Sequence, residues 1–549
     1  MTRYTQFNKS IVPNKTYSMV KAVLMALGVV LVLAMMIDYV SLPAYNIHDM
    51  GFLGLLILYF GLFGFLVYFF SGKLTVISYA SFVVALSIVG FIIVFSILGS
   101  EILNADRFQQ QLNITEETNF SADFDLDNNY VIPYIDEETA QQLGDKQIGK
   151  VQGLGSQYNI NINYTLVSVG EKVYRISPLE YQDIYKWWQN KNNGIPGYIK
   201  VDVQDFNDAS IVSLAKGMKY SPSAFFDQDL LRHVRFKYRT AILDDFSFEI
   251  DDAGNPFYVI SVIEPKIGFF SGWDATAVIV VDAISGEMNR YDLDEIPSWI
   301  DRVQPVSIAW FQVDNWGYYI HGWWNTIFGQ KDVLQTTSGY NYVSIEGQTY
   351  VYSGMTSVGS DRSIVGFSLI NLRTKLATFY KIGGADENSA MSSAQGQVQH
   401  LGYQATFPVL VRISNEASYF MSLKDQEGLI KMFAIVNVSD YSIVGVGATL
   451  TEVKADYNAK LIEAGIIEGS NSDTISLSTT VKSVTQSIID GQSRYFIEVN
   501  DSNVLFYVDL SLNPEIALTK VGDPILIEYL KSDAKILPVL TFDNIALAY

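Results

Sequence analysis

Three long apolar runs within the first 100 residues constrain this chain more than any other feature. Residues 22–37 are uncharged, and the run reaches roughly twenty residues if Lys21 and Asp38 extend their charges toward water. Residues 51–70 and 74–98 are uncharged throughout. As a helix rising about 1.5 Å per residue, the second run spans about 30 Å, the hydrocarbon thickness of a bilayer. We predict three transmembrane helices, over about 20–40, 51–70 and 74–98.

Two other interpretations of these runs are weaker. A cleaved signal peptide has an apolar core of about 7–15 residues, which the first run exceeds, and SLPAYN at 41–46 is a poor cleavage site. Buried core helices would need a polar face, and three successive runs without one are hard to place in a soluble core. A retained membrane anchor over residues 1–100 is the better interpretation.

The positions of the basic residues predict the orientation. The first 21 residues hold four basic residues and no acid, which favours the cytoplasmic side. Residues 41–50 contain Asp49 and no basic residue, and Lys73 then marks a return to the inside. Three crossings place everything after about residue 100 outside the cytoplasm of a bacterial cell. Because the spans hold no charged residue between Lys21 and Asp38 at the two ends of the first one, or anywhere in the other two, we do not expect an ion or proton pathway.

Composition excludes several kinds of chemistry. Residues 101–549 hold 32 of the 37 basic and 56 of the 58 acidic residues, a net charge of −24, which disfavours nucleic acid as a partner and docking onto anionic lipid by charge alone. The chain has no cysteine, so disulfides, thiol nucleophiles and Cys-ligated metals are excluded. Its four histidines lie far apart without HExxH spacing, and we predict no metal and no cofactor.

Residues 101–150 are polar and acidic, and we predict a stalk. Within it Asp123, Asp125 and Asp127 stand at the alternate positions that calcium loops use. The twelfth position of such a loop is Tyr134 in place of the usual glutamate. A solvated turn or an acidic edge strand explains the same spacing, and we prefer it to a calcium site.

Residues 151–465 show the alternation of short strands and helices that is typical of an α+β fold with antiparallel sheets. After a helical pattern at 221–243, hairpins are expected to turn at 252–255 and at Ser285-Gly286. This helix followed by meandering strands, closing on VVDAISGEM, resembles the PepSY domain. The same pattern returns as a helix near 384–403 and four strands over 406–447. The resemblance implies two units, at about 220–295 and 360–465, in domains 151–345 and 346–465, and a link to restraining peptidases or to envelope association.

The last domain, 472–549, follows the linker GIIEGSNSD and reads as five strands in about 75 residues, with a short helix or loop near 511–522. Five strands with a connector at that place look like an OB-fold, a small β-barrel. Residues 470–549 carry five basic and ten acidic side chains, so a protein-binding, glycan-binding or structural barrel fits better than one that binds oligonucleotides.

Few residues suggest catalysis. Ser213 and Lys216 have the Ser-x-x-Lys spacing of a serine hydrolase, which needs a helix to bring the lysine to the nucleophile, but no SDN or KTG element accompanies them. The carboxylate pairs Asp244/Asp245 and Asp251/Asp252 might suggest a glycosidase. Adjacent residues on a strand point to opposite faces, so we expect neither pair to converge on one bond.

The densest aromatic segment is residues 309–328, which includes Trp310, Trp316, Trp323 and Trp324. At helical spacing its aromatic residues form two stripes. They indicate either a core helix between sheets, which we prefer because aromatic residues bury large areas, or a helix that docks on lipid or on a partner.

These observations predict an integral membrane protein with a large extracytoplasmic α+β region. The function that we expect is that of a non-catalytic scaffold or binding protein of the bacterial cell envelope, whose partners are other envelope proteins. A PepSY-like regulator of an extracytoplasmic peptidase is the alternative, and a Ser213/Lys216 hydrolase is a third.

Overall fold

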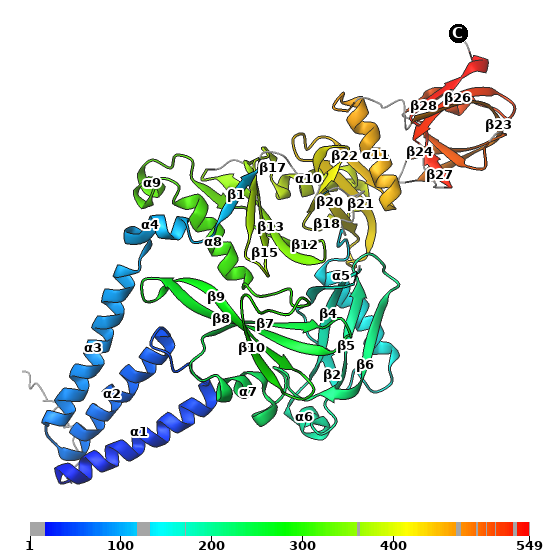
Figure 1. The fold of residues 1–549 in the computed structure, drawn as a ribbon. Coiled ribbons are helices and arrows are strands. Elements are labelled where there is room, and N and C mark those ends of the chain that lie inside the picture. The colour runs from blue at the N-terminus through cyan, green and yellow to red at the C-terminus, as the bar shows by residue number, and fades with distance from the viewer. Residues whose placement is uncertain are drawn as a thin grey trace, which may run out of the picture.

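The computed structural model describes residues 17–117, 124, 132–170, 172–359, 363–467, 474–489, 492–500, 502–510, 512–530 and 535–547. Its first three helices are α1 (Met19–Ser41), α2 (Met50–Ser71) and α3 (Val76–Leu98), and each is long and apolar enough to cross a membrane. They project from one end of the molecule, while the C-terminal strands lie at the opposite end (Figure 1). The three predicted helices are therefore confirmed.

Local chemistry sets the ends of these helices. The Asp49 side chain accepts a hydrogen bond from the backbone N–H of Gly51 (2.7 Å) at the start of α2, and Gly72 ends the helix with a φ of +71°. A capping box of Thr75 and Ser78 begins α3. At Gly64 a Cβ atom would lie 3.1 Å from the Cβ of Ser81, so a glycine there lets α2 and α3 pack closely.

The segment predicted to be a stalk is folded onto the rest of the molecule where it is described. Helix α4 (Glu101–Gln109) packs on α8 (Val306–Tyr318), and β1 (Ile114–Glu117) pairs in parallel with β16 (Ala377–Tyr380). Helix α5 (Glu137–Lys150) covers β5 (Ile195–Asp202) and β6 (Ala209–Met218). The stalk prediction is wrong because polar composition does not prevent a segment from completing a sheet edge.

Two antiparallel sheets follow. The first has the order β2-β4-β5-β6, with β3 also on β4, and helix α6 (Ile184–Asn190) joins β4 to β5. The second follows a 3-10 turn, η2 (Phe226–Gln228), and helix α7 (Leu230–Lys237), which is shorter than the helical pattern predicted, and it is a meander in the order β10-β9-β8-β7. Both predicted hairpins are present. The strands of the two sheets are β2 (Tyr158–Ile160), β3 (Thr165–Val169), β4 (Lys172–Tyr181), β7 (Leu243–Ile250), β8 (Pro256–Ile267), β9 (Ser271–Asp282) and β10 (Met288–Asp292).

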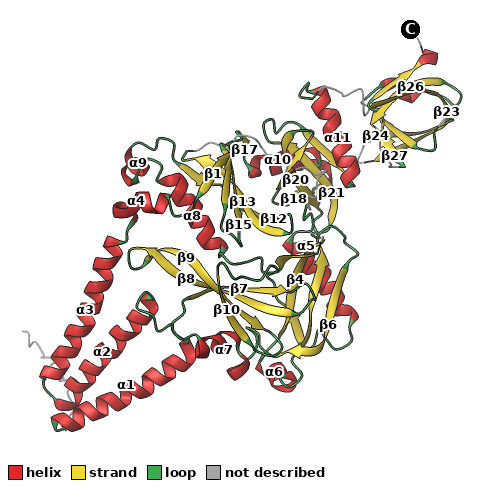
Figure 2. Cartoon of the chain, in the orientation of Figure 1, coloured by secondary structure: helices red, strands yellow, loops and turns green. Residues whose placement is uncertain are grey.

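The next region adds a six-stranded sheet, in the order β1-β16-β15-β13-β11 with β12 on β13, and a five-stranded sheet, in the order β18-β20-β21-β22 with β19 on β20. The four strands predicted over 406–447 are β19 to β22. Helices α10 (Glu387–Gln397) and α11 (Leu450–Glu463) flank the second sheet (Figure 2). The strands are β11 (Leu334–Thr336), β12 (Asn341–Ile345), β13 (Gln348–Ser357), β14 (Ser363–Ile364), β15 (Gly366–Asn371), β17 (Gly384–Ala385), β18 (Gln404–Ala405), β19 (Val409–Ile413), β20 (Glu416–Lys424), β21 (Ile430–Asn437) and β22 (Val444–Gly447).

The C-terminal domain is one curled sheet in the order β27-β25-β24-β23-β26-β28. The long strand β23 pairs with β26 through its first half and with β24 through its second half. The last of the five predicted strands divides into β27 and β28, which are consecutive in sequence and end the sheet on opposite sides. The elements are β23 (Thr474–Ile489), β24 (Gln492–Val499), β25 (Leu505–Asp509), η4 (Pro514–Leu518), β26 (Pro524–Leu530), β27 (Ile536–Pro538) and β28 (Thr541–Asn544).

Candidate functional site

A cavity of about 600 Å³ lies where several separate elements of residues 132–467 converge. Its wall is built from the start of α5, the loop before β3, strands β4, β7 and β8, the loop that leads into α8, and strand β12. It is lined by both charged and aromatic side chains. The charged ones are Asp136, Glu137, Arg175, Asp244, Asp245 and Arg302, and the aromatic ones are Tyr164, Phe246, Phe248, Tyr258, Tyr340, Tyr342 and Phe407.

Part of this charge is used by the fold itself. Asp136 caps α5 and pairs with Lys424 (2.7 Å), while Glu137 accepts a hydrogen bond from the backbone N–H of Tyr164 (2.8 Å). Arg175 is almost fully buried, and its Nε donates to the Ile135 carbonyl (2.8 Å). Three of the six charged groups therefore have structural partners.

Arg302 lacks such a partner at Nε. Its guanidinium lies over the ring of Tyr342, with 4.7 Å from the guanidinium carbon to the ring centroid, and its Nε is buried without a hydrogen-bond partner among the described residues. Because an unsatisfied buried donor costs about 1–3 kcal/mol, a fold keeps one where a ligand or water completes it. The planar guanidinium suits carboxylate or phosphate groups.

Asp245 faces Arg302 from strand β7 under backbone strain. Its φ is +45°, a left-handed conformation that residues other than glycine rarely adopt, and it stands at a bulge where β7 slips against β8 between Asp244 and Phe246. Burial raises the pKa of Asp245; the positive charge of Arg302 opposes this shift and the negative charge of Asp244 adds to it. Strained residues of this kind cluster at functional sites.

The bulge also corrects a prediction. Regular alternation should send Asp244 and Asp245 to opposite faces of the strand, yet both line the cavity. The extra residue in β7 interrupts the alternation at this place. The other pair behaves as expected of a hairpin flank, since Asp251 accepts hydrogen bonds from the backbone N–H groups of Ala253 and Asn255.

Behind the cavity wall, two carboxyl groups share a buried site. The Glu249 side chain accepts a hydrogen bond from the backbone N–H of Asp301 (2.8 Å). Burial, together with the nearby charge of Asp301, raises the pKa of Glu249 to about 8. Burial likewise raises the pKa of Asp301 to about 7, against the opposing hydrogen bond from the backbone N–H of Ser168. Protons are therefore held here near neutral pH, next to the residue that carries the free guanidinium.

The loop that carries Asp301 and Arg302 is fixed by the turn between β15 and β16. Arg373 donates to the carbonyls of Ile296 (3.0 Å) and Ile300 (3.1 Å), and the Leu372 carbonyl accepts the backbone N–H of Gln304 (2.8 Å). Lys375 pairs with Asp274 on β9 (2.8 Å). These contacts fix the backbone on both sides of Arg302, which is the kind of preorganisation that a binding site needs.

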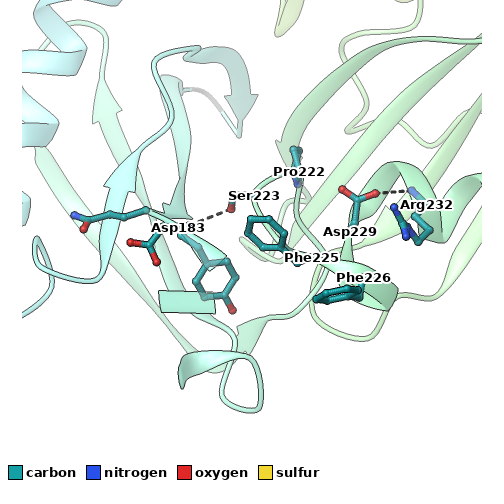
Figure 3. Close-up of a pocket in the computed structure, with 10 residues that line it drawn as sticks. Asp183, Pro222, Ser223, Phe225, Phe226, Asp229 and Arg232 are labelled. Carbon is teal, nitrogen blue, oxygen red and sulfur yellow. Dashed lines mark hydrogen bonds between the residues drawn. The ribbon is translucent and has the colours of Figure 1, made fainter. Parts of the chain in front are cut away.

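A second cavity, of about 300 Å³, lies between α6 and α7. Asp183, Ser223, Phe225, Phe226 and Arg232 are among the residues that line it, and Asp229 caps α7 beside it (Figure 3). It is smaller than the first and exposes fewer charged groups.

The serine and lysine proposed for a hydrolase lie away from the cavity. Ser213 and Lys216 are exposed on strand β6 and not on a helix, so the helical spacing assumed for a hydrolase is absent. The calcium candidates Asp123, Asp125 and Asp127 lie outside the described residues. Among the described candidates, neither Ser213 nor Lys216 lines the cavity.

The aromatic segment is not one helix. Helix α8 ends at Tyr318, and α9 (Trp323–Phe328) begins after Gly322, whose φ is +76°. Trp316 is buried against Phe379 (ring centroids 5.2 Å apart), whereas Trp324 is 64% exposed and stacks on Phe328. Trp310 lies against Tyr340 beside the cavity, and Trp323 packs edge-on against Trp324. The stripes continue only within α8, because the glycine turn redirects the chain.

Sequence reasoning missed Arg175, Glu249, Asp301 and Arg302, and it considered Asp245 but dismissed it. The sequence held only a weak indication of these buried charges. Glu249 lies in the alternating run FSFEI, and Asp301-Arg302 interrupt the apolar stretch IPSWIDRVQPVSIAW. A charge inside an apolar stretch marks a buried group, but its partners come from distant parts of the chain.

Comparisons with known proteins identify no family for this chain. No protein-family model matches the chain, and no curated protein matches it. Among solved structures, a crystal structure of a levansucrase point mutant from B. megaterium is similar over 78% of this chain and 95% of its own, at 10% identity. Its TM-score of 0.19 is too low to support a common fold or function.

Proposed function

We propose that this chain is a non-catalytic, membrane-anchored binding protein of the bacterial cell envelope that takes its ligand in the large cavity. The observation that carries the proposal is the guanidinium of Arg302, held rigidly in a polar cavity with a buried N–H that no described residue satisfies. The three apolar helices support attachment to the membrane. The positions of the basic residues favour an extracytoplasmic location for the cavity.

The lining indicates the kind of ligand. A carboxylate or phosphate group is the chemistry that a planar guanidinium binds best, through paired hydrogen bonds. Tyr342 and Phe407 offer apolar surface to the rest of the ligand, and Asp244 offers an acceptor. We propose a ligand with an acidic group and an apolar part, such as a short peptide or an acidic small molecule.

Two finer proposals concern the domains. The pairing of the C-terminal strands, with β25 parallel to β27 and β23 between β24 and β26, supports an OB-fold-like barrel that contacts proteins or glycans. The helix α7 followed by the meander β7 to β10 supports a PepSY-like unit. A regulator of an extracytoplasmic peptidase is thus the second candidate, and crosslinking in intact membranes should then recover a peptidase whose activity changes on binding.

The binding proposal is tested with the full chain in nanodiscs. Arg302→Gln removes the guanidinium, and Arg290→Gln, an exposed arginine paired with Asp292, is the matched control. Thermal unfolding is followed with a panel of acidic small molecules and dipeptides, since a ligand at 100 times its Kd stabilises by about 2.7 kcal/mol. We expect some compound to raise the Tm of wild type and Arg290→Gln but not of Arg302→Gln. If the panel leaves wild type unchanged, or stabilises all three chains equally, the cavity is not the binding site.

A further inference from the structure

Helix α7 is attached to the outer end of the first membrane helix. The backbone N–H of Tyr45 donates to the Arg239 carbonyl (2.8 Å), and the Asn46 amide donates to the Thr240 carbonyl (2.9 Å). The guanidinium of Arg232 lies 4.1 Å from the centroid of the Tyr39 ring, in the last turn of α1. These contacts join the loop between α1 and α2 to a helix almost 200 residues away.

A second contact fixes the same side of the molecule against α3. The tip of the β8–β9 hairpin places Phe269 against Phe91 and Phe95, with ring centroids 5.1 and 5.2 Å apart. His48 Nδ1 lies 2.9 Å from the Phe269 carbonyl oxygen. Because these segments contact α1 and α3 near the ends of both helices, the domain must lie next to the bilayer. Figure 1 shows α7, with α6 beside it, at the level where α1 ends.

The residues that α6, η2 and α7 expose at that level are of two kinds. Phe236 is 50% exposed, on the same face of α7 as Arg232 one turn earlier, and Trp188 of α6 is 62% exposed. Residues 230–240 hold four basic side chains and no acidic one; Lys237 and Arg239 are exposed, whereas Arg235 is buried and Arg232 lies against Tyr39. Trp187 packs against Phe225 and Phe226 and so joins α6 to η2. Large aromatic and basic residues together are typical of the interface between a bilayer and water.

The charges next to the bilayer, and not the net charge of residues 101–549, determine how this face interacts with lipid. Residues 101–549 carry a net charge of −24, which would keep an anionic surface at a distance. At physiological salt, however, charges more than about 8 Å apart are largely screened, so exposed Lys237 and Arg239 act on the lipids next to them. Asp183 and Asp229 are engaged as helix caps, and exposed Asp227 on η2 opposes the basic residues only in part.

We propose that the exposed face of α6, η2 and α7, termed here the α7 surface, lies in the lipid headgroup layer of the leaflet that faces the domain. Phe236 and Trp188 enter the boundary between headgroups and acyl chains, and exposed Lys237 and Arg239 contact lipid phosphates. The domain is then held at a fixed height over the membrane by three helices and this surface together. The proposal does not depend on which side of the membrane the domain occupies, nor on a ligand in the cavity.

The absence of native cysteine allows a direct test. Phe236→Cys and Trp188→Cys are each labelled with a nitroxide in the full chain, in nanodiscs of phosphatidylethanolamine and phosphatidylglycerol. Tyr441→Cys, which replaces a 54% exposed tyrosine in the turn between β21 and β22, is the matched control. Collision with oxygen and with a water-soluble nickel chelate reports the depth of each label. Thermal unfolding of the labelled chains checks that they are folded, and Tyr185→Cys on α6 replaces any variant that is not.

We expect the labels at 236 and 188 to lose accessibility to nickel and gain accessibility to oxygen, while the label at 441 stays aqueous. The difference at 236 should vanish in chains labelled and measured in denaturant. Labels at 236 and 188 that are as accessible to nickel as the label at 441 would overturn the proposal. Shielding at 236 alone would overturn the inclusion of α6 and confine the surface to α7.

Discussion

The central body, residues 101–467, and the C-terminal domain, residues 474–547, treat buried polar groups differently. In the C-terminal domain the buried Asn544 amide donates to Thr519 (2.9 Å) and Asp523 (3.0 Å), and half-buried Arg494 meets Asp509 through two hydrogen bonds of 2.7 and 3.1 Å. In the central body, Glu249 and Asp301 share a buried site and Arg302 keeps an unsatisfied N–H. Among the described residues, every buried side-chain polar atom without a partner lies between Gln111 and Glu387.

This difference indicates that the C-terminal domain serves stability alone, whereas the central body also carries a candidate binding site. The same chain satisfies its buried polar groups in one domain, so the unsatisfied ones in the other are not a general weakness of its packing. Unpaired buried groups cost stability and persist where they do something else. The central body is therefore the place to look for function.

The largest effect should come from the core of the C-terminal domain. Phe506→Ala removes a fully buried ring and should cost about 3–5 kcal/mol of the free energy of unfolding, confined to that domain. Hydrogen exchange read separately for residues 474–547 and 132–467 measures it. Equal loss of protection in the central body would break the comparison, because the two regions would then unfold as one.

In the central body, removing a buried cation should cause the next largest loss in the free energy of unfolding. Lys424→Met leaves Asp136 without its partner in a site where the lysine is almost fully buried, and should cost about 1–3 kcal/mol. Lys431→Met breaks an exposed pair with Asp425 and should cost less than about 1 kcal/mol. Chemical unfolding of both variants gives the two values, and similar costs would show that burial does not matter here.

The pair of Glu249 and Asp301 predicts a pH dependence of stability. Both folded pKa values, about 8 and about 7, lie above the ordinary values of 4.5 and 3.8, so the folded state binds protons more tightly than the unfolded state. The resulting stabilisation is complete below about pH 4 and is lost as the pH rises through 7 to 8. Glu249→Gln should flatten the decline in Tm between pH 5 and pH 8.5. If the decline in Tm with pH is unchanged in this variant, other groups cause the pH dependence.

The smallest effect concerns the strained backbone at Asp245. Asp245→Gly relieves a left-handed conformation that costs about 1 kcal/mol, an amount partly cancelled by the greater freedom of glycine in the unfolded chain, so the net gain should be about 0.5 kcal/mol. The same change should weaken ligand binding in the cavity. Asp245→Asn, which tolerates the left-handed conformation, should leave stability unchanged. Denaturant unfolding of the two variants measures the difference, and a destabilised glycine variant would contradict the assignment of strain.

The sequence predicted those parts of the molecule that depend on neighbouring residues. The membrane helices followed from uncharged runs, the hairpin at Gly286 from its turn residues, and strands β19 to β22 from alternation. The cavity could not be predicted in this way, because Arg175, Asp245 and Arg302 come from three separate places in the chain and meet only through tertiary packing. The bulge at Asp245 and the break between α8 and α9 are local, but their effect on direction depends on what the strands and helices pack against.

The central claim is that three membrane crossings carry the cavity to the outside of the cell, and cysteine labelling in spheroplasts tests it most directly. In this cysteine-free chain, Tyr441→Cys and Lys73→Cys each provide one target for a membrane-impermeant maleimide. We expect position 441 to be labelled in intact spheroplasts and position 73 to be labelled only after lysis. Labelling at 73 before lysis, with 441 protected until lysis, would contradict it.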